Sequence, residues 1–263
     1  MAQASAADRP AVVTGAARGI GAAIAERLCR AGHPVAIIDV HGESAQGTAD
    51  ALHREHGVPA IGVGADVADS KSVLSALSHI RTQLGPISIL VNNAGVISVA
   101  PFLQVHESEW DRIMAINTKG QFLCAQAVLP DMLAQRWGRI INIASDAAKT
   151  AEPFIAHYSA SKFAVIGLTQ SIALEYAATG ITANAVCPAI TDTAMMEDLA
   201  KQLASATAES DRNTWRDGMV REIPLGRPMA PHDIAALCGY LVTDDAAAIS
   251  GQAINVSGAH ELH

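Results

Sequence analysis

A tyrosine and a lysine lie four residues apart in the segment Tyr158-Ser159-Ala160-Ser161-Lys162, which has helical period. This spacing places both side chains on one face of a helix. A free phenol titrates near pH ~10, too high for a base at neutral pH, but a cation within about 4–6 Å lowers the pKa of an acid by about 1–3 units. We therefore expect Tyr158 to exchange a proton with a substrate and Lys162 to lower the pKa of its phenol.

Further polar side chains precede this pair at the ends of two apolar segments. Ser145 closes the segment Asn142-Ile143-Ala144-Ser145, thirteen residues before the tyrosine, where its hydroxyl can orient a substrate oxygen. Asn92-Asn93-Ala94-Gly95 follows an earlier apolar segment, and Asn117 lies in the helical pattern after it. These groups extend the candidate site for proton transfer.

A glycine-rich stretch, Thr14-Gly15-Ala16-Ala17-Arg18-Gly19-Ile20-Gly21, joins the first apolar segment to a helical pattern that begins near Ile20. Gly15 permits a sharp exit from a strand, Gly19 lets the backbone approach a pyrophosphate, and Gly21 lets the helix pack against a sheet. The helix N-terminus offers unpaired N–H groups and a positive dipole end to phosphates. The stretch therefore predicts a dinucleotide-binding loop.

Asp39 ends the next apolar segment, in Ile37-Ile38-Asp39-Val40, where a carboxylate can accept hydrogen bonds from adenosine ribose hydroxyls. A 2′-phosphate carries about −1.5 to −2 charges. Two unit charges about 4 Å apart interact by ~4 kcal/mol at an effective dielectric of about 20, so Asp39 disfavours the phosphorylated cofactor. Arg18 is the opposing feature because it can pair with a 2′-phosphate, but neither Val40 nor His41 assists it. The balance favours NAD.

Short apolar segments alternate with longer amphipathic ones along the chain. The predicted strands are 11–14, 35–39, 60–63, 87–91, 139–143, 181–186 and 253–256. The predicted helices lie near 19–31, 43–56, 70–84, 107–135, 156–178 and 231–242. Several strands are almost continuously apolar, which suits parallel strands covered on both faces. The alternation predicts one α/β domain built on a doubly wound parallel sheet.

One segment, from about 191 to 222, departs from this alternation. It has helical propensity, yet it lies between a strand and the last helix, where a connection is normally short. We interpret it as an insertion that forms a helical substrate lid over the carboxyl ends of the strands. Met195, Met196 and Trp215 either line an apolar substrate pocket there or pack the lid onto the domain.

These motifs, in this order and spacing, resemble the short-chain dehydrogenase/reductase family in its common form. The resemblance covers Thr14 to Ser257 and implies a Rossmann fold of seven strands. It also implies that Asn117, Ser145, Tyr158 and Lys162 form a catalytic tetrad, in which Tyr158 is the acid/base, Lys162 holds the nicotinamide ribose and Asn117 anchors a water in a proton relay. The implied cofactor-binding residues are Gly15, Arg18, Gly19, Ile20, Gly21, Asp39, Asp66, Val67, Asn93, Ala94, Gly95, Tyr158, Lys162, Pro188, Ile190 and Thr193.

Ala189 departs from the family pattern, which has Pro-Gly after the sixth strand. If glycine serves there for a positive φ, the loop from Pro188 to Thr193 must adjust. Family members are mostly tetramers built on the helices near 107–135 and 156–178 and on the last strand, so the resemblance also implies a homotetramer.

The composition excludes several classes of protein. The chain has 18 basic and 26 acidic side chains and a formal charge of −8, which argues against nucleic acid or an anionic membrane as a partner. The four cysteines are far apart in apolar surroundings, which predicts buried free thiols in a reducing compartment. We expect a cytoplasmic protein that binds no metal. The tail His260-Glu261-Leu262-His263 is interpreted as solvated or intersubunit rather than metal-binding.

The predicted activity is hydride transfer between NAD(H) and a secondary alcohol or ketone. Asp146, Lys149, Glu152 and His157 could hydrogen-bond a hydroxylated substrate, which favours a polyol or a sugar. His157 is otherwise a solvated helix position. Two alternatives stay open: a ketone or 3-oxoacyl reductase that uses NADPH, and a regulator that senses NAD without turnover.

Overall fold

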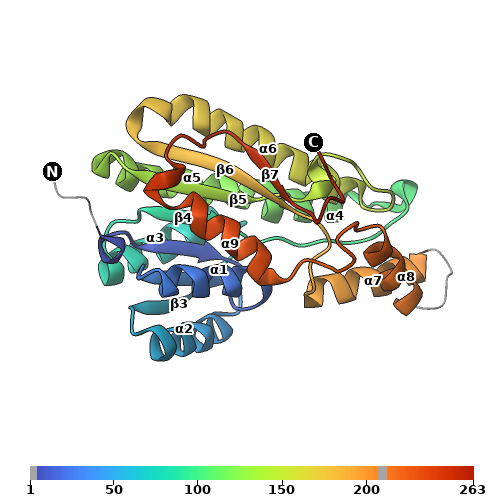
Figure 1. Cartoon of the computed structure of the whole chain (residues 1–263), viewed down its shortest axis with the longest axis horizontal. Coiled ribbons are helices and arrows are strands. Elements are labelled where there is room, and N and C mark those ends of the chain that lie inside the picture. The colour runs from blue at the N-terminus through green and yellow to red at the C-terminus, as the bar shows by residue number, and fades with distance from the viewer. Residues whose placement is uncertain (1–4, 207–211) are drawn as a thin grey trace.

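A computed structural model describes residues 5–206 and 212–263 of the chain. Its centre is a seven-stranded sheet in the order β3-β2-β1-β4-β5-β6-β7 (Figure 1). Every neighbouring pair of strands is parallel. The strand order reverses at β1: β2 and β3 lie on one side of it, and β4 to β7 lie on the other. The doubly wound parallel sheet predicted from the alternating pattern is confirmed.

The observed strands follow the predicted ones closely. They are β1 (Ala11–Thr14), β2 (Val35–Asp39), β3 (Ala60–Gly64), β4 (Ile89–Asn92), β5 (Gly138–Ile143), β6 (Ile181–Pro188) and β7 (Ala253–Val256). All residues of β1, β4, β5 and β6 are buried, while the edge strands β3 and β7 are partly exposed. The central strands are apolar throughout because both of their faces pack against helices.

Helices cover both faces of the sheet and bury two separate apolar cores. On one face lie α1 (Gly19–Arg30), α2 (Gly42–His56) and α9 (Pro231–Leu241). On the other face lie α3 (Ser70–Leu84), α5 (Gly120–Gln135) and α6 (Ala156–Tyr176). Burial of these apolar faces holds the ends of the strands, and the loops that follow them, in fixed positions.

The predicted helix near 107–135 is interrupted. It consists of α4 (Glu107–Met114), a π-helical turn at Ala115–Lys119 and α5. The hydrophobic pattern runs through this break, so periodicity alone does not reveal it. Asn117 lies in the π-helical turn, and such turns are frequent at functional sites because they redirect a side chain.

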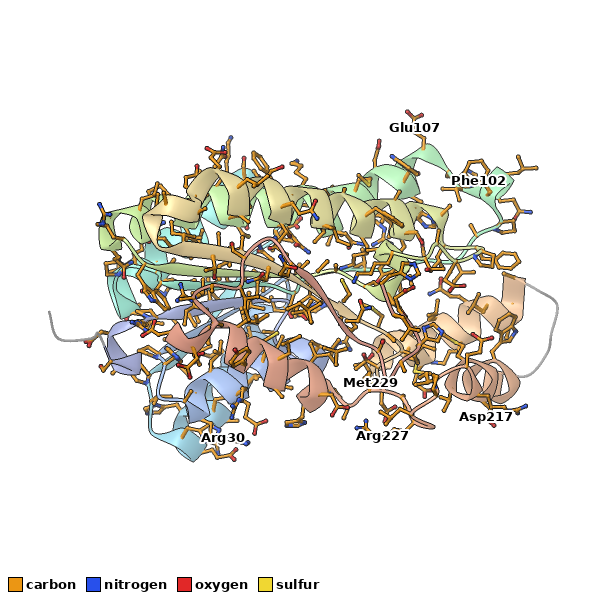
Figure 2. The ribbon with its side chains drawn as sticks, turned by 45° about the horizontal axis from the view of Figure 1, so that its top comes forward. Arg30, Phe102, Glu107, Asp217, Arg227 and Met229 are labelled. Atoms are coloured by element: carbon orange, nitrogen blue, oxygen red, sulfur yellow. The ribbon has the colours of Figure 1, made fainter. Side chains whose placement is uncertain are left out.

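Two helices fill the connection between β6 and α9. They are α7 (Ala194–Ala206) and α8 (Arg212–Arg221), and both lie at one end of the sheet in Figure 1. Figure 2 shows Asp217 of α8 and Phe102, which follows β4, at the same end of the molecule. The amide of Val99 donates to Oε1 of Gln202 at 3.0 Å, so α7 is bound to the segment after β4. No helix in the described part of the chain is both long and apolar enough to cross a membrane.

The four cysteines are free and buried, as predicted. Burial raises the pKa of the Cys29, Cys124 and Cys238 thiols to about 12 and that of Cys187 to about 11. These thiols pack as small apolar side chains and form no thiolate at neutral pH.

An aromatic and ionic cluster closes the amino ends of the strands. Trp137 lies under two guanidinium groups, 4.0 Å from Arg9 and 4.4 Å from Arg139. Asp244 accepts hydrogen bonds from Arg9 at 3.1 Å and from the indole of Trp137 at 2.9 Å, and it lies 3.6 Å from Arg139. The cluster joins β5 to the segment after α9.

Candidate active site

The predicted site residues gather at the carboxyl edge of the sheet. Asp39 ends β2, Asn92 ends β4, Ser145 follows β5 and Pro188 ends β6. Pairing in register brings Asn92 opposite Asn142 and Ile143 opposite Val186, so the loops after these strands are neighbours. In an open parallel sheet, ligands bind outside this edge, near the point where the strand order reverses.

The glycine-rich loop needs its glycines for conformation and for space. Gly15 and Gly19 both have a φ of +61°, which L side chains adopt only with strain. A Cβ added at Gly15 would lie 2.7 Å from the Cα of Ala94, and one at Gly21 would lie 2.5 Å from Nδ2 of Asn93. Helix α1 begins at Gly19, one residue before the predicted Ile20, and Arg18 is its exposed N-cap.

Asp39 is held against this loop. Its Oδ2 accepts a hydrogen bond from the amide of Ala17 at 3.2 Å, and its Oδ1 accepts one from the amide of His41 at 3.1 Å. Asp66, after β3, is exposed and accepts a hydrogen bond from Ala68, whereas Val67 is buried. These two predicted cofactor-binding residues therefore differ: Asp66 can contact a ligand with its side chain, and Val67 packs against Gly120 at the start of α5.

The segment after β4 is bound to the first strand. Nδ2 of Asn93 donates to the carbonyl oxygens of Thr14 and Gly15, both at 2.9 Å. The amides of Asn93 and Ala94 both donate to Oγ1 of Thr14 at 3.0 Å. Asn93 thus fixes the shape of the glycine-rich loop, as well as lying beside it.

The segment after β6 keeps its path without glycine. Ala189 is buried and does not have a positive φ, and its amide donates to the carbonyl of Val256 at 3.2 Å. The adjustment that the sequence predicted for Pro188 to Thr193 is therefore unnecessary. Oγ1 of Thr193 accepts a hydrogen bond from the amide of Met196 at 3.4 Å, so Thr193 caps α7, and Ile190 packs against the core. Thr193 also lies near Gly19 of the glycine-rich loop: a Cβ added at Gly19 would lie 3.7 Å from Cγ2 of Thr193.

Tyr158 and Lys162 lie on the same face of α6, as their spacing predicts. The Lys162 ammonium lies 5.6 Å from the centroid of the Tyr158 ring and donates to the carbonyl of Ile143 at 2.8 Å. Burial raises the pKa of Tyr158 to about 12, although a hydrogen bond with Ser145 lowers it, and burial lowers the pKa of Lys162 to about 8. Among the protein's own groups burial has the largest effect on the phenol pKa, and the lowering expected from Lys162 stays a prediction.

Ser145 lies between the phenol of Tyr158 and the carboxylate of Asp146. Its hydroxyl donates to Oδ1 of Asp146 at 2.9 Å and accepts from the amide of Ala147 at 3.2 Å. Burial raises the pKa of the Asp146 carboxyl, and hydrogen bonds from Ser145 and Ala147 oppose that rise. The negative charge of Asp146 in turn raises the pKa of Tyr158.

Asn117 links three parts of the site. Its Oδ1 accepts from the amide of Val96 at 2.8 Å, and its Nδ2 donates to the Val96 carbonyl at 2.9 Å and to Oγ of Ser161 at 3.0 Å. A Cβ added at Gly95 would lie 3.4 Å from Oδ1 of Asn117 and 3.5 Å from Nζ of Lys162. The absence of a side chain at Gly95 therefore leaves room for a ligand to approach Asn117 and Lys162.

The arrangement fits a nicotinamide dinucleotide. The left-handed glycines, the N-terminus of α1 and Asp39 are the groups that recognise a pyrophosphate and a ribose. The sequence profile of the family described as short chain dehydrogenase matches residues 9–204. The chain belongs to this family. It is therefore an oxidoreductase that acts on alcohol and ketone groups with a nicotinamide cofactor.

Relatives of this short-chain dehydrogenase differ in activity. The chain is 37% identical over 251 residues to the 3-oxoacyl-[acyl-carrier-protein] reductase FabG of Staphylococcus aureus, covering 95% of this chain and 97% of the relative. A solved NAD⁺-bound xylitol dehydrogenase is 29% identical with a TM-score of 0.91, covering 95% of this chain and 98% of the other. A variant of actinorhodin polyketide ketoreductase, solved with NADPH, is 35% identical with a TM-score of 0.93, covering 99% and 100%.

His157, next to the tyrosine of this short-chain dehydrogenase, is completely buried. Its Nε2 lies 2.7 Å from Oγ of Ser98, in the segment after β4, and its Nδ1 has no hydrogen-bond partner among the described residues. The interpretation of His157 as a solvated helix position is wrong, because α6 packs this face against α4. His157 also does not line the cavity formed by Asp146 and the C-terminal tail.

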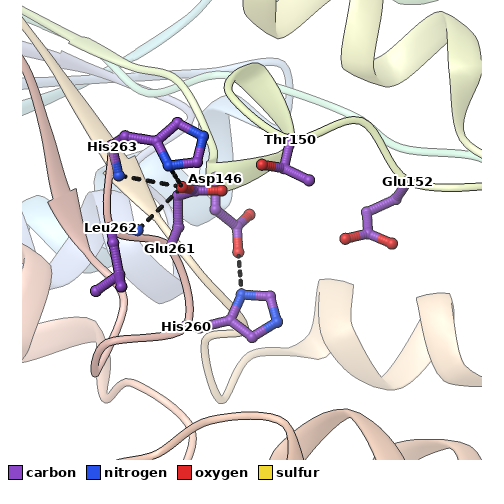
Figure 3. A pocket seen from close by; sticks show the side chains of 7 residues that line it. All are labelled: Asp146, Thr150, Glu152, His260, Glu261, Leu262 and His263. Carbon is purple, nitrogen blue, oxygen red and sulfur yellow. Dashed lines mark hydrogen bonds and ion pairs between the residues drawn. The ribbon is translucent and has the colours of Figure 1, made fainter.

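A cavity of about 320 Å³ in this short-chain dehydrogenase is lined by Asp146, which follows Ser145 in the chain (Figure 3). The residues that line it are Asp146, Thr150, Glu152, His260, Glu261, Leu262 and His263. The C-terminal tail thus forms one wall, and Asp146 and Glu152 come from the loop between β5 and α6. Lys149, expected to bind substrate, instead donates to the Ala253 carbonyl at 2.7 Å.

The tail is only partly solvated. Glu261 is buried and His260 is largely covered, whereas Leu262 is 81% exposed. Nδ1 of His260 lies 3.1 Å from Oδ2 of Asp146, while Nδ1 of His263 lies 3.3 Å from Glu261. The two histidines therefore pair with different carboxylates. The contact of His260 with Asp146 joins residues 114 positions apart, and no local spacing in the sequence predicts it.

The apolar residues that were predicted in the lid have different positions. Met196 is buried and packs α7 onto the domain, whereas Met195 is 43% exposed. Trp215 of α8 is partly buried, and its indole nitrogen has no hydrogen-bond partner among the described residues. Of the two alternatives, an apolar pocket lining or packing of the lid onto the domain, Met196 therefore has the second role.

Proposed function

We propose that this short-chain dehydrogenase uses NAD and oxidises a polyol or a sugar. Asp39 carries the cofactor assignment. Its carboxylate is fixed by the amides of Ala17 and His41, so the charge cannot turn away from a ligand in the glycine-rich loop. Two ribose hydroxyls can donate to it, while a 2′-phosphate meets like charge.

Tyr158 is the proposed general base of alcohol oxidation, and Ser145 positions the substrate oxygen. When bound, NAD⁺ accepts the hydride from the carbinol carbon and brings a positive charge to the site. Tyr158 removes the hydroxyl proton, and its phenol is within hydrogen-bonding reach of Ser145. Lys162 holds the nicotinamide ribose, a role that its position beside Gly95 supports.

Asn117 has a proposed role in proton exchange with solvent through Lys162. Oδ1 of Asn117 and Nζ of Lys162 both approach Gly95, which supports the idea. The direct hydrogen bonds of Asn117 go to Val96 and Ser161, so it also holds the segment after β4 against α6.

The cavity lined by Asp146 and the C-terminal tail supports the proposal of a hydroxyl-rich substrate. Asp146, Glu152 and Thr150 offer acceptors to hydroxyl groups beyond the reacting carbon. Burial and the charges of Asp146 and Glu222 raise the pKa of Glu152, which indicates an acidic environment. Such a site disfavours substrates with a carboxylate or a phosphate close to the reacting carbon.

A second candidate is a 3-oxoacyl or ketone reductase that uses NADPH. The 37% identity to the Staphylococcus aureus reductase and the likeness to the NADPH-bound ketoreductase favour it. Arg18, exposed at the start of α1, is the residue of this chain that could receive a 2′-phosphate. A regulator without turnover is disfavoured, because Tyr158 and Lys162 are both present on one helix face.

Initial rates of NADH formation with a panel of polyols, sugars, hydroxy acids and simple secondary alcohols test the proposal. Each substrate is run with NAD⁺ and with NADP⁺, and a 3-oxoacyl thioester is run in reduction with NADH and with NADPH. Oxidation of a polyol or sugar that is faster with NAD⁺ supports the proposal. Reduction of the thioester with NADPH, together with inactive polyols, supports the second candidate instead.

We further propose a cytoplasmic homotetramer of a single-domain enzyme, in which the insertion from about 191 to 222 forms the lid. Residues 207–211 of this insertion lie outside the described residues. Apolar side chains are exposed along α4, α5 and α6, the helices expected at the subunit interface, and β7 is an edge strand. They are Trp110, Phe122, Leu133, Phe163 and Leu174. Sedimentation velocity of the pure protein tests the assembly: a tetramer supports it, and a monomer at micromolar concentration contradicts it.

A further inference from the structure

The C-terminal tail reaches the active site through one histidine. Nδ1 of His260 lies 3.1 Å from Oδ2 of Asp146 (Figure 3). Oδ1 of Asp146 accepts a hydrogen bond from the hydroxyl of Ser145 at 2.9 Å. The His260 and Asp146 side chains are 19% and 17% exposed, and Ser145 is buried. A continuous path of hydrogen bonds therefore runs from the tail to Ser145.

Ser145 has one proton and more than one acceptor for it. In the structure that proton is directed to Asp146, and the hydroxyl also accepts a hydrogen bond from the amide of Ala147. A substrate oxygen held by Ser145 needs the same proton, since a hydroxyl donates only once. An ionised Asp146 with both oxygens free would retain this proton strongly, because hydrogen bonds to a charged acceptor are roughly twice as strong as neutral ones.

We propose that His260 is a positioning residue, which draws the charge of Asp146 towards Oδ2 and so releases the Ser145 hydroxyl for the substrate oxygen. The proposal rests on the roles proposed above for Ser145 and Tyr158. His260 touches neither residue and acts through Asp146 alone.

The electrostatics of Tyr158 give the proposal a second consequence. The negative charge of Asp146 raises the pKa of Tyr158, and His260 lowers the pKa of Asp146 by its charge and its hydrogen bond. By drawing the charge of Asp146 towards Oδ2, His260 weakens the field of this carboxylate at the phenol. Without it, the base of alcohol oxidation is ionised only at higher pH.

Other charged groups surround His260, and most of them are acidic. Glu152 faces it from the loop after β5, and Oε2 of Glu222, after α8, lies 3.8 Å from its Nε2. Within the tail, Glu261 binds the amides of Leu262 and His263 and pairs with the His263 imidazole. Lys149 is engaged with the Ala253 carbonyl. Among the described residues, His260 is thus the basic side chain that contacts Asp146.

The test is the pH profile of alcohol oxidation for His260→Ala and His260→Gln, each also in an Asp146→Asn background. His260→Ala should raise the apparent pKa of the rising limb by about one unit, which lowers kcat at pH 7 about tenfold. The KM for the alcohol should rise and that for the cofactor should not. His260→Gln retains a hydrogen-bond donor without charge and should give a smaller shift.

In the Asp146→Asn background, the apparent pKa of the rising limb should be lower than in the wild type, and His260→Ala should shift it no further. His232→Ala is the matched control, because this histidine also pairs with a carboxylate, Glu26 at 3.3 Å, on the helices α9 and α1. It should keep the wild-type profile. NADH binding and thermal melting establish that each variant is folded.

Two outcomes overturn the proposal: a profile of His260→Ala that equals the wild type, or a shift that persists undiminished without the Asp146 charge. Failure of the proposed catalytic roles gives a different result, since Ser145→Ala and Tyr158→Phe would then retain turnover. If those two variants are inactive while His260→Ala is normal, only the role of the tail is wrong.

Discussion

Asp39, at the end of β2, is hydrogen-bonded to the backbone of Ala17 in the glycine-rich loop, with 3.2 Å between its Oδ2 and the amide nitrogen. The loop and the carboxylate come from different βα units, and this contact fixes the distance between them. Arg18, the next residue, is exposed and has no such restraint. The fixed carboxylate of Asp39 and the exposed guanidinium of Arg18 therefore have opposite effects on which dinucleotide is preferred.

Replacement of Asp39 should change that preference. Asp39→Ala removes the like charge next to a 2′-phosphate and leaves Arg18 to attract it, so the ratio of kcat/KM for NAD⁺ over NADP⁺ should fall at least about tenfold. Initial rates with both cofactors measure the ratio. Arg18→Ala in the Asp39→Ala background should restore part of the preference, and an unchanged ratio in Asp39→Ala would contradict the selector role.

Removal of the Tyr158 hydroxyl should abolish turnover without abolishing cofactor binding. Tyr158→Phe loses the proton acceptor, and general-base catalysis contributes about 10²–10⁴-fold to a rate. Single-turnover rates of alcohol oxidation and a fluorescence titration with NADH measure the two effects separately. Tyr176→Phe, on the same helix and far from Ser145 in the chain, is the control. Substantial turnover by Tyr158→Phe would show that another group is the base.

Most of the fold was predictable because its determinants are local. The strands β1 and β7 have the predicted bounds, since continuous apolar runs between polar residues leave little choice. The π-helical turn at Ala115–Lys119 was missed because one extra residue in a turn hardly alters a hydrophobic pattern. His157 was misassigned for a similar reason: periodicity does not show that α4 packs onto this face of α6.

The site was predictable where its residues are close in the sequence. Tyr158 and Lys162 meet because helical spacing requires it, and Ser145 follows from the end of a strand. The pairing of His260 with Asp146 joins residues far apart in the chain, and only the complete fold brings them together. The effect of burial on the pKa of Tyr158 was not predicted for the same reason, because desolvation depends on everything packed around the phenol.

Lys162 should limit the stability of the protein. Burial lowers its pKa from 10.5 to about 8, so keeping it charged in the folded state costs up to about 3 kcal/mol at neutral pH. Lys162→Met has a similar length and should raise the free energy of unfolding at pH 7 while turnover is lost. In Lys162→Met the carbonyl of Ile143 no longer accepts a hydrogen bond from the ammonium, but Nε2 of Gln121 still donates to it at 3.4 Å.

The pH dependence of this effect has a defined sign. Because the folded pKa lies below the unfolded one, the penalty is complete below pH 8 and disappears as pH rises towards 10.5. The gain in Lys162→Met should therefore shrink to below about 1 kcal/mol at pH 10. Urea unfolding at both pH values measures it, with the exposed Lys119→Met as control. An equal gain at both pH values would mean that packing, rather than charge, is responsible.

Asp244 should stabilise the domain from the edge of the sheet opposite the active site. It neutralises Arg139, which is only 2% exposed, and accepts the indole proton of Trp137. Breaking a fully buried ion pair costs about 3–5 kcal/mol, and since Asp244 is 32% exposed, Asp244→Ala should cost about 2 kcal/mol. This corresponds to a loss of about 4–8 °C in Tm. The exposed neighbour Asp245→Ala should leave Tm unchanged, and both variants should retain turnover at 25 °C because the cluster lies at the amino ends of the strands. A loss of activity in folded Asp244→Ala would mean that this edge is coupled to the site.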